Sequence, residues 1–377
     1  MIKKNTKTRI LFVLHLPPPV HGASVMGKYI HDSEKVNSEF DCRYVNLTTA
    51  KGLENLGKGG WGKLWAFGKK LWEIRRAIRV QQPDGVYITP NSTGGPFFKD
   101  FVVVQWCKWL TKGKVILHFH NKGVSTRQNR WIDNILYQQF FKITEVILLG
   151  RPLFEDVKKY VPEERVHFCA NGIQICRGAR YKVRGRESNS RILFLSNLLI
   201  TKGVLELLDA LTLLRTKGRN VVCDFVGGET AEIDAQRMRK EITERQLEGM
   251  AVYHGCKYGE EKEKFFEQAD IFCFPTYYHN ECFPLVLLEA MQHGLPCIST
   301  NEGAIPNIID EGITGLIIEK RNTEQLAEKL ELLLSNKNRR LKMGRAGKEK
   351  YEREFTLERF EQRFVEVLKD KLHDNRQ

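Results

Sequence analysis

Residues 270–300 read DIFCFPTYYHNECFPLVLLEAMQHGLPCIST and contain one complete strand–helix–strand pattern. The apolar run at 270–278 predicts a strand, HNECFP at 279–284 a loop, and LVLLEAMQH at 285–293 a helix that Gly294 ends. LPCIST at 295–300 predicts the next strand. Both strands are almost continuously apolar, which is typical of parallel strands covered on both faces. The stretch therefore predicts one βαβ unit of a doubly wound sheet.

The same alternation continues along the chain. Further strands are predicted at 9–16, 85–90, 114–120, 145–150, 165–171, 191–198, 221–228, 250–256 and 314–319, mostly separated by helix-length segments. A chain of 377 residues exceeds what one hydrophobic core usually supports. We therefore expect an α/β protein with an N-terminal Rossmann-like domain at 1–176, a linker at 177–190 and a C-terminal Rossmann-like domain at 191–354. A last helix at about 355–377 is expected to pack back on the first domain.

Composition and charge limit the class of protein. No apolar run is long enough to span a membrane, and the basic N-terminus leads into a short run that is typical of a first strand rather than a signal peptide. Nine scattered cysteines without a C-x-x-C pair indicate reduced thiols in a cytoplasmic protein and argue against a zinc site.

Residues 1–190 hold 32 Lys and Arg against 15 Asp and Glu, a net charge of +17, so this half is expected to face nucleic acid, phospholipid or a phosphorylated substrate.

Ligands of doubly wound sheets bind beyond the carboxyl ends of the strands, so the loops that follow strands hold the candidate residues. Gly22 lies before a predicted helix, where backbone amides favour an anion, and His120 ends a predicted strand. Lys202 is predicted at a helix N-terminus, which opposes the helix dipole unless an anion lies between them. A stiff turn, a core histidine and a solvated lysine are the alternative interpretations.

Two further features complete the candidate site. Gly227 and Gly228 follow a buried strand, where they suit either a close ligand or a tight turn. Glu281 and Glu289 are eight positions apart, on either side of a predicted helix start. Two acceptor-only carboxylates beside a helix N-terminus suit a ligand with a phosphate and hydroxyl-rich groups, such as a nucleotide sugar. There is no D-x-D or phosphate-loop motif, and Gly227 and Gly228 do not belong to a G-x-G-x-x-G, so no metal-assisted nucleotide site is predicted.

Taken together, these residues resemble the retaining glycosyltransferases of family 4, which have the two-domain GT-B architecture with two Rossmann-like domains facing across a cleft. SNLLITKG at 196–203 looks like the family's G-R-L-x-x-x-K-G segment, and ECFPLVLLE at 281–289 looks like its E-x7-E signature. FVGG at 225–228 lies between them in the expected order. The N-terminal half is similar only at PPPVHGAS, at the histidine after VILHF and at ANGI, 170–173.

The resemblance implies roles for these residues. His120, Lys202 and Glu281 would be catalytic, with Lys202 neutralising the leaving diphosphate and His120 contacting the sugar near the reacting carbon. Glu289 would hold the ribose hydroxyls, while Glu281 and the backbone near Cys282 would hold the donor sugar. The full expected donor-binding set is Gly22, Asn197, Lys202, Gly227, Gly228, Glu281, Cys282, Phe283, Pro284, Leu285 and Glu289. Asn197 stands where the family has an arginine, so one phosphate cation is missing.

The resulting hypothesis is transfer of a sugar from a UDP- or GDP-linked donor to an acceptor hydroxyl, with retention, without a metal and without a cofactor. We expect a glycan or lipid-linked acceptor of bacterial envelope polysaccharide synthesis and no nucleic-acid partner. A sugar-nucleotide epimerase or hydrolase on the same fold remains an alternative, and so does a basic nucleic-acid-binding protein. The sequence does not predict an oligomeric state.

A basic amphipathic segment at 58–80 adds a membrane hypothesis. Its tryptophans and cations would lie in the lipid headgroup layer, at the anionic inner face of the plasma membrane. The protein would then be a cytoplasmic protein that is bound peripherally to this membrane. The expected membrane residues are Trp61, Trp65, Lys69, Lys70, Trp72, Arg75 and Arg76. The alternative is an ordinary Rossmann helix that packs its apolar side on its own sheet.

Overall fold

The computed structural model describes residues 7–18, 22–48, 61–176 and 190–373, without the side chains of Trp61, Lys63 and His373. It contains two compact units, Met1–Asn171 with Leu357–Gln377, and Gly172–Thr356. Each unit holds a six-stranded sheet in which every paired strand is parallel. The predicted α/β fold with two doubly wound parallel sheets is therefore confirmed. The expected linker, 177–190, lies outside the described residues except for its last position.

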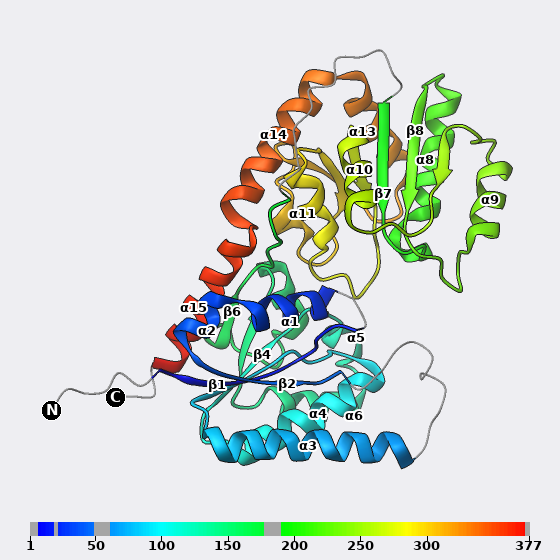
Figure 1. Ribbon diagram of the computed structural model, residues 1–377. Helices are drawn as coiled ribbons and strands as arrows, with labels where there is room; N and C mark the ends of the chain where they lie inside the picture. The colour runs from blue at the N-terminus through cyan, green and yellow to red at the C-terminus, as the bar shows by residue number, and fades with distance from the viewer. Residues whose placement is uncertain (1–6, 19–21, 49–60, 177–189, 374–377) are drawn as a thin grey trace. The chain divides into compact units, whose positions relative to one another are not determined.

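The sheet of the first unit has the strand order β2-β1-β3-β4-β5-β6. Its strands are β1 (Arg9–Leu14), β2 (Asp41–Asn46), β3 (Gly85–Ile88), β4 (Lys114–His118), β5 (Glu145–Leu148) and β6 (Val166–Phe168). Its helices are α1 (Gly22–Asp32), α2 (Glu34–Glu39), α3 (Trp61–Gln81), α4 (Gly94–Leu110), α5 (Val124–Arg127), α6 (Trp131–Phe141), α7 (Phe154–Val157) and α15 (Leu357–His373). Figure 1 shows the sheet between a layer with α1, α2 and α15 and a layer with α3, α4 and α6.

The C-terminal helix α15 supplies part of the core of this first unit. The Phe364 side chain is fully buried, and its ring lies 5.2 Å from that of Tyr87 and 6.4 Å from that of Phe12. Phe360 and Leu368, one turn away on either side, are also fully buried. A strongly one-sided apolar face of this kind stabilises a helix mainly through packing. The first sheet thus depends on residues from the far end of the chain.

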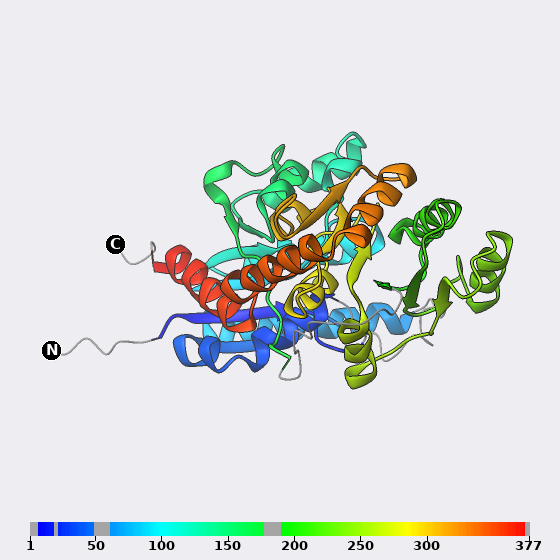
Figure 2. The same ribbon diagram turned by 90° about the horizontal axis from the view of Figure 1, so that it is seen from above.

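The sheet of the second unit has the order β12-β11-β10-β7-β8-β9. Its strands are β7 (Ser190–Leu195), β8 (Val221–Val226), β9 (Ala251–Tyr253), β10 (Ile271–Phe274), β11 (Cys297–Thr300) and β12 (Gly315–Ile318). Its helices are α8 (Val204–Thr216), α9 (Ala235–Glu244), α10 (Gly259–Gln268), α11 (Leu285–Gln292), α12 (Ile305–Ile308), α13 (Thr323–Ser335) and α14 (Lys337–Glu354). The two views in Figures 1 and 2 show α8 and α9 on one side of β7 and β8, and α11 on the other.

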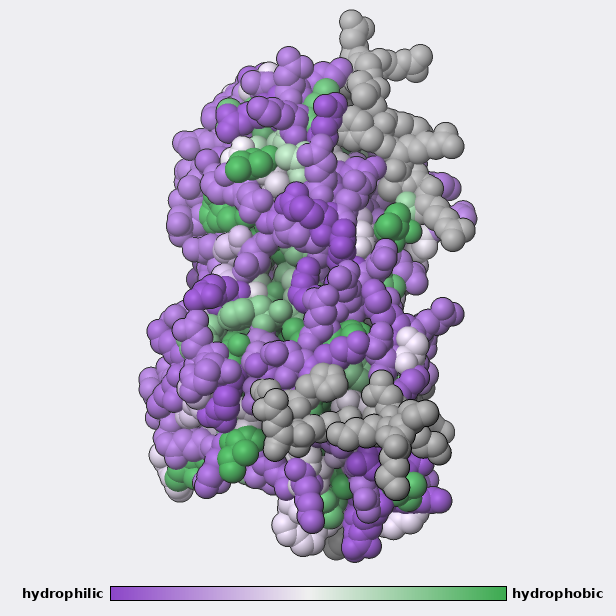
Figure 3. All heavy atoms as spheres, turned by 90° about the vertical axis from the view of Figure 1, so that its left-hand side faces the viewer, coloured by the Kyte–Doolittle hydropathy of each residue, from purple (hydrophilic) through white to green (hydrophobic). Residues whose placement is uncertain are grey.

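Most of the surface drawn in Figure 3 is hydrophilic, and its hydrophobic areas are small and separate. On α14, Arg339, Lys342 and Arg345 are all exposed. Among the described residues, no helix combines the length and apolar character that crossing a bilayer requires.

The buried position of Phe364 leads to a stability prediction. Phe364→Ala should destabilise the first unit by about 3–5 kcal/mol, because it removes a large ring from a closed core and leaves a cavity. Urea unfolding followed by tryptophan fluorescence measures the loss. The matched control is Phe98→Ala on α4, since Phe98 is 44% exposed and the same deletion should cost far less. Equal effects of the two substitutions would mean that α15 does not contribute to this core.

Candidate nucleotide-sugar site

The strand order of the second unit reverses between β7 and β10. Successive connections run outward from β7 through β8 to β9, and the chain then returns to the other side of β7 to add β10, β11 and β12. The loops after β7 and β10 therefore diverge at neighbouring strand ends and leave a crevice, which is where doubly wound sheets bind ligands. These two loops contain Lys202 and Glu281, the predicted catalytic residues of this unit.

Lys202 and Glu281 form an ion pair across this switch point. The distance from the lysine Nζ to the Glu281 Oε2 is 2.5 Å, and the two side chains are only 14% and 11% exposed. The same Nζ lies 4.5 Å from the ring centre of Tyr278 and 5.4 Å from that of Phe274. Removing one partner of a buried pair leaves an uncompensated charge, which costs about 3–5 kcal/mol. The two side chains therefore depend on each other.

Two helices begin at the switch point without a side-chain cap. The N-cap of α8 is Gly203 and that of α11 is Pro284, and neither makes a side-chain capping hydrogen bond. By contrast, α9, α13 and α14 begin with Asp234, Asn322 and Asn336, each of which accepts a hydrogen bond from its helix. The first N–H groups of a helix need acceptors and carry a partial positive charge. Both uncapped ends are therefore suited to bind an anion such as a diphosphate.

Glu289 has a different partner from Glu281. It lies on α11, and its Oε1 accepts a hydrogen bond of 2.7 Å from the Nζ of Lys262 on α10. The two side chains are 20% and 22% exposed, so a ligand hydroxyl can reach the carboxylate more easily than in a closed core. Glu289 thus pairs with a neighbouring helix of the same unit.

The glycines of this region allow loops to approach each other closely. Gly203 has a φ of +84°, and a Cβ there would lie 2.4 Å from the carbonyl oxygen of Pro275, in the loop after β10. A Cβ on Gly227 would lie 1.7 Å from the carbonyl oxygen of Ser196, in the loop after β7. Contacts this short exclude any side chain. The protein itself therefore explains both glycines without a ligand, which for Gly227 is the tight-turn interpretation.

The remaining predicted donor-binding residues of this unit lie in the same loops. Asn197 follows β7, and its Oδ1 would be 3.1 Å from a Cβ built on Gly228. The side chains of Cys282 and Phe283 are almost fully buried, and the carbonyl of Cys282 accepts a hydrogen bond from the Ala304 amide at 2.8 Å. Near Cys282, Phe283 and Pro284, a ligand would therefore meet backbone rather than side-chain atoms, whereas the Leu285 side chain is partly exposed.

Gly22 and His120 belong to the first unit. Gly22 begins α1, and a Cβ there would meet no described atom within 4 Å, so packing within the described residues does not require a glycine. His120 is partly exposed and lies two residues beyond the end of β4. Its neighbour His118 is fully buried against the hydroxyl of Tyr87 at 2.7 Å, and burial lowers the pKa of His118 well below its usual value. His118 is thus a neutral core residue, whereas His120 stays a candidate.

Lys262, Phe274 and Tyr278 were not predicted to take part in the site. Lys262 lies in an ordinary charged helix, 27 positions before Glu289, and nothing in that spacing indicates their contact. Phe274 and Tyr278 lie just before the predicted loop that contains Glu281. This proximity in sequence is the one feature that could have indicated that they belong to the site. Their contact with Lys202 depends on the pairing of β10 with β7.

Part of the chain resembles a known protein family. Residues 180–350 match the family model described as "Glycosyl transferases group 1". A putative colanic acid biosynthesis glycosyltransferase, WcaL of Salmonella typhimurium, is 25% identical over 227 residues, which cover 59% of this chain and 55% of that protein. The match thus spans about half of that relative.

Solved structures share the whole fold at low identity. A sucrose-phosphate synthase from Thermosynechococcus elongatus superposes with a TM-score of 0.76 at 15% identity, covering 98% of this chain and 100% of the other. HepE from Anabaena, in complex with UDP-glucose, superposes with a TM-score of 0.71 at 15% identity, covering 96% and 99%. The segment 180–350, which contains the Lys202–Glu281 pair and Glu289, therefore carries the sequence pattern of the glycosyl transferases group 1. The chain as a whole has the two-sheet fold of these solved structures.

Proposed function

We propose that the protein is a retaining, metal-independent glycosyltransferase that moves a sugar from a nucleotide-sugar donor to the hydroxyl of a lipid-linked envelope glycan. The observation that carries the proposal is the Lys202–Glu281 pair between the uncapped starts of α8 and α11. A cation and two helix N-termini suit a diphosphate, and a carboxylate beside them suits sugar hydroxyls. The match of residues 180–350 to the glycosyl transferases group 1 supports the same reaction class.

The proposed chemistry assigns each group one task. The bond between the anomeric carbon and the diphosphate oxygen breaks, and the acceptor oxygen bonds to that carbon on the same face. The acceptor proton passes to the departing diphosphate oxygen, so no separate carboxylate nucleophile is needed. Lys202 stabilises the negative charge that grows on the leaving diphosphate, which is the role a divalent metal would otherwise have. Glu281 orients the donor sugar and keeps Lys202 in place, and Glu289 binds the ribose.

The donor and acceptor classes rest on the relatives. HepE was solved with UDP-glucose, which supports a UDP-linked donor here, with GDP as the alternative. WcaL is described as acting in colanic acid biosynthesis, which supports an envelope polysaccharide as the pathway. His120 of the first unit is proposed to contact the donor sugar. Asn197 stands where the resembled family has an arginine. Lys202 and the two helix N-termini would therefore have to neutralise more of the negative charge of the diphosphate.

Helix α3 supports a peripheral membrane location because only part of its apolar surface packs. Ile74, Ala77 and Ile78 are buried, as the Rossmann interpretation expects, but Trp65 is 73% exposed and Trp72 is 56% exposed. The two tryptophans are two turns apart and so share a face. Lys69 lies over the Trp65 ring at 6.0 Å, and Arg76 lies over the Trp72 ring at 5.6 Å. An exposed face of tryptophans with stacked cations is typical of a segment in the lipid headgroup layer.

The neighbouring helix α4 extends this surface. Trp106 of α4 donates a hydrogen bond of 3.1 Å to the backbone carbonyl of Leu71 on α3, and the adjacent Trp109 is 73% exposed. A hollow of about 640 Å³ between α4, α6 and the starts of β4 and β5 is lined by cations, with Glu145 as one acid among them. The lining cations are Lys108, Lys112, Lys114, Lys142 and Arg165. Such a cluster favours anionic phospholipid headgroups.

The Glu289–Lys262 pair generates a binding prediction. Glu289→Gln keeps the size of the side chain but removes its charge, so UDP or GDP should bind more weakly by about 1.5–3 kcal/mol, the range for a lost hydrogen bond to a charged group. Isothermal titration calorimetry measures this effect. Glu260→Gln, an exposed acid on α10, is the matched control and should bind normally. If Glu289→Gln binds the nucleotide as tightly as wild type, Glu289 does not bind the ribose and its role is only the structural contact with Lys262.

Lys202 generates a kinetic prediction. Lys202→Met should lower kcat by about 10²–10³, the range for one lost donor to a developing negative charge, with a smaller effect on KM. Because this variant also leaves Glu281 buried without its partner, the double variant Lys202→Met/Glu281→Gln is needed as well. The double variant should regain thermal stability but not activity, since neither partner is then charged.

Two outcomes would contradict this role. Recovery of activity in the double variant would make the pair structural only, and a loss confined to KM would place Lys202 in ground-state binding. Lys217→Ala, at the exposed end of α8, is the control and should retain full turnover. Wild-type activity that requires added magnesium or manganese would overturn the metal-independent mechanism.

A donor panel separates transfer from the alternative chemistry. Wild-type protein is incubated with UDP- and GDP-sugars, with and without a membrane extract that supplies lipid-linked acceptors. Transfer predicts that release of nucleotide depends on the acceptor and that the sugar label enters the lipid fraction. Release of nucleotide at the same rate without acceptor would favour a hydrolase, and conversion of the sugar in the donor would favour an epimerase.

The membrane proposal predicts salt-sensitive flotation with vesicles. Wild type should float with phosphatidylglycerol vesicles and dissociate as salt rises, because the attraction between cations and headgroups is screened. The triple variant Lys69→Glu/Arg76→Glu/Arg79→Glu on α3 should remain soluble. The same number of charge reversals on α14, Lys337→Glu/Lys342→Glu/Arg345→Glu, should leave flotation intact. Equal flotation of both variants would reject α3 as the membrane surface. Strong, salt-sensitive binding to nucleic acid, without binding to vesicles, would favour the alternative that the protein is a nucleic-acid-binding protein.

A further inference from the structure

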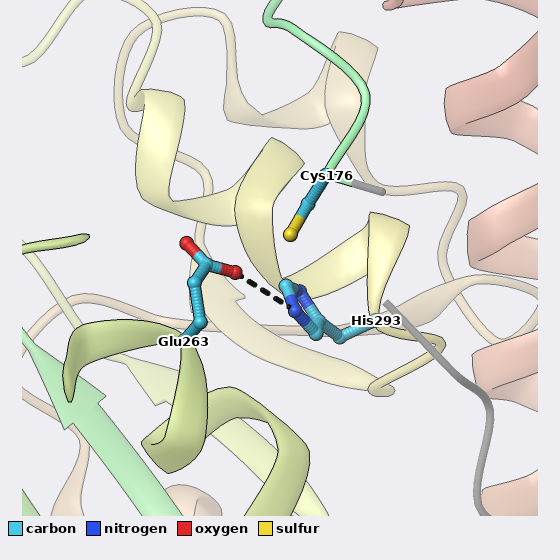
Figure 4. A group of neighbouring side chains, drawn as sticks. All are labelled: Cys176, Glu263 and His293. Carbon is cyan, nitrogen blue, oxygen red and sulfur yellow. Dashed lines mark ion pairs between the residues drawn. The ribbon is translucent and has the colours of Figure 1, made fainter. Parts of the chain in front are cut away.

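A cluster of three potential metal ligands lies in the second unit, next to α11. It contains Cys176, Glu263 on α10, and His293 at the end of α11. One donor atom of each lies within 4.8 Å of the other two. Figure 4 shows the three side chains pointing toward one another from three separate segments of the chain. None of these residues has a role in the proposed sugar transfer.

The histidine ring is held in one orientation. Its Nδ1 lies 2.8 Å from the backbone carbonyl oxygen of Glu289, and because a carbonyl only accepts, Nδ1 must carry a proton. The ring also stacks on Phe266 at 5.1 Å with an interplanar angle of 15°, and the residue is only 6% exposed. A metal-binding histidine typically donates its second N–H to a carbonyl or carboxylate in this way, which leaves Nε2 to bind the metal.

Nε2 of His293 and Oε2 of Glu263 lie 3.0 Å apart. Both atoms are buried and neither has a hydrogen-bond partner among the described residues, so a cation bound between them would satisfy both.

The cysteine is fixed by its backbone. The amide of Cys176 donates a hydrogen bond of 3.0 Å to the side-chain oxygen of Gln292, the residue before His293. Just before it in the chain, the carbonyl of Ile173 accepts a hydrogen bond of 3.1 Å from the Tyr351 hydroxyl on α14. Residues 173–176 are thus tied to α11 and α14, which holds the thiol near the imidazole.

We propose that Cys176, Glu263 and His293 bind a zinc ion, with the thiolate, one carboxylate oxygen and Nε2 as ligands and a water molecule at the fourth position. A mixed sulfur, nitrogen and oxygen set suits zinc better than magnesium or calcium, which prefer oxygen ligands. Binding releases the thiol proton to solvent, together with any proton on Nε2. The absence of a C-x-x-C pair does not exclude this site, because its ligands come from three distant segments.

A zinc ion there would join the chain at 176 to α10 and α11. It would also fix the C-terminal end of α11, the helix that carries Glu289 and begins beside the Lys202–Glu281 pair. The inference does not depend on the proposed glycosyl transfer, because its test measures metal binding alone.

The experiment uses the full chain, freed of metal with a chelator and titrated with cobalt(II) and then zinc. Wild type should bind one equivalent of cobalt with the intense absorption of thiolate-to-cobalt charge transfer, and zinc should displace it and raise the thermal midpoint. Cys176→Ser should lose that absorption and weaken zinc binding by at least about tenfold, since loss even of a supporting contact costs about 10–100-fold. Glu263→Gln should weaken zinc binding and retain the absorption.

Matched controls are Cys256→Ser, an exposed cysteine of the same unit, and Glu261→Gln, an exposed acid on α10. Both should bind cobalt as wild type does. Metal-free thermal midpoints of all variants separate loss of binding from loss of fold. The proposal is overturned if wild type gives no thiolate absorption with cobalt, or if that absorption persists in Cys176→Ser; His293 and Glu263 would then be an ordinary ion pair.

Discussion

The candidate site depends on a close approach of two loops at the switch point of the second sheet. Gly203 follows Lys202, and a Cβ at this position would collide with the carbonyl of Pro275, which lies between β10 and Glu281. The approach brings a lysine from the loop after β7 into contact with a carboxylate from the loop after β10. The helices α8 and α11 follow the neighbouring strands β7 and β10, and neither begins with a side-chain cap. One steric constraint thus assembles a cation, a carboxylate and two helix N-termini.

Helix α11 connects the proposed donor site to the proposed zinc site. Its first residue follows the loop of Glu281, its middle carries Glu289, and the backbone carbonyl of Glu289 orients the ring of His293 at the other end. The side chain of Glu289 is held at the same time by Lys262, which lies next to Glu263 on α10. Movement of α10 against α11 would therefore affect both sites. Occupancy of the zinc site and nucleotide affinity are expected to be linked through this pair of helices.

The first unit uses its helices for two different purposes. The C-terminal helix α15 gives its apolar face entirely to the core, where Phe364 packs on Tyr87. Helix α3 buries Ile74 and Ile78 in the same way but leaves Trp65 and Trp72 exposed beneath Lys69 and Arg76. The buried isoleucines fit packing on the sheet, and the exposed tryptophans support the proposed membrane contact.

The sequence by itself determined the two parallel sheets, because near-continuous apolar runs between helical segments have few other stable arrangements. It also identified the loops of Lys202 and Glu281, since polar residues directly after buried strands must lie at the carboxyl edge of a sheet. Only the tertiary structure decided which charges meet: Glu281 with Lys202, but Glu289 with Lys262, a residue that no local pattern distinguishes. The same holds for Cys176, Glu263 and His293, which are distant in sequence and become neighbours only when α10 and α11 pack on one sheet. Local periodicity fixes the direction of a side chain relative to its own element, whereas its partners depend on strand order and helix packing, which are set by the whole chain.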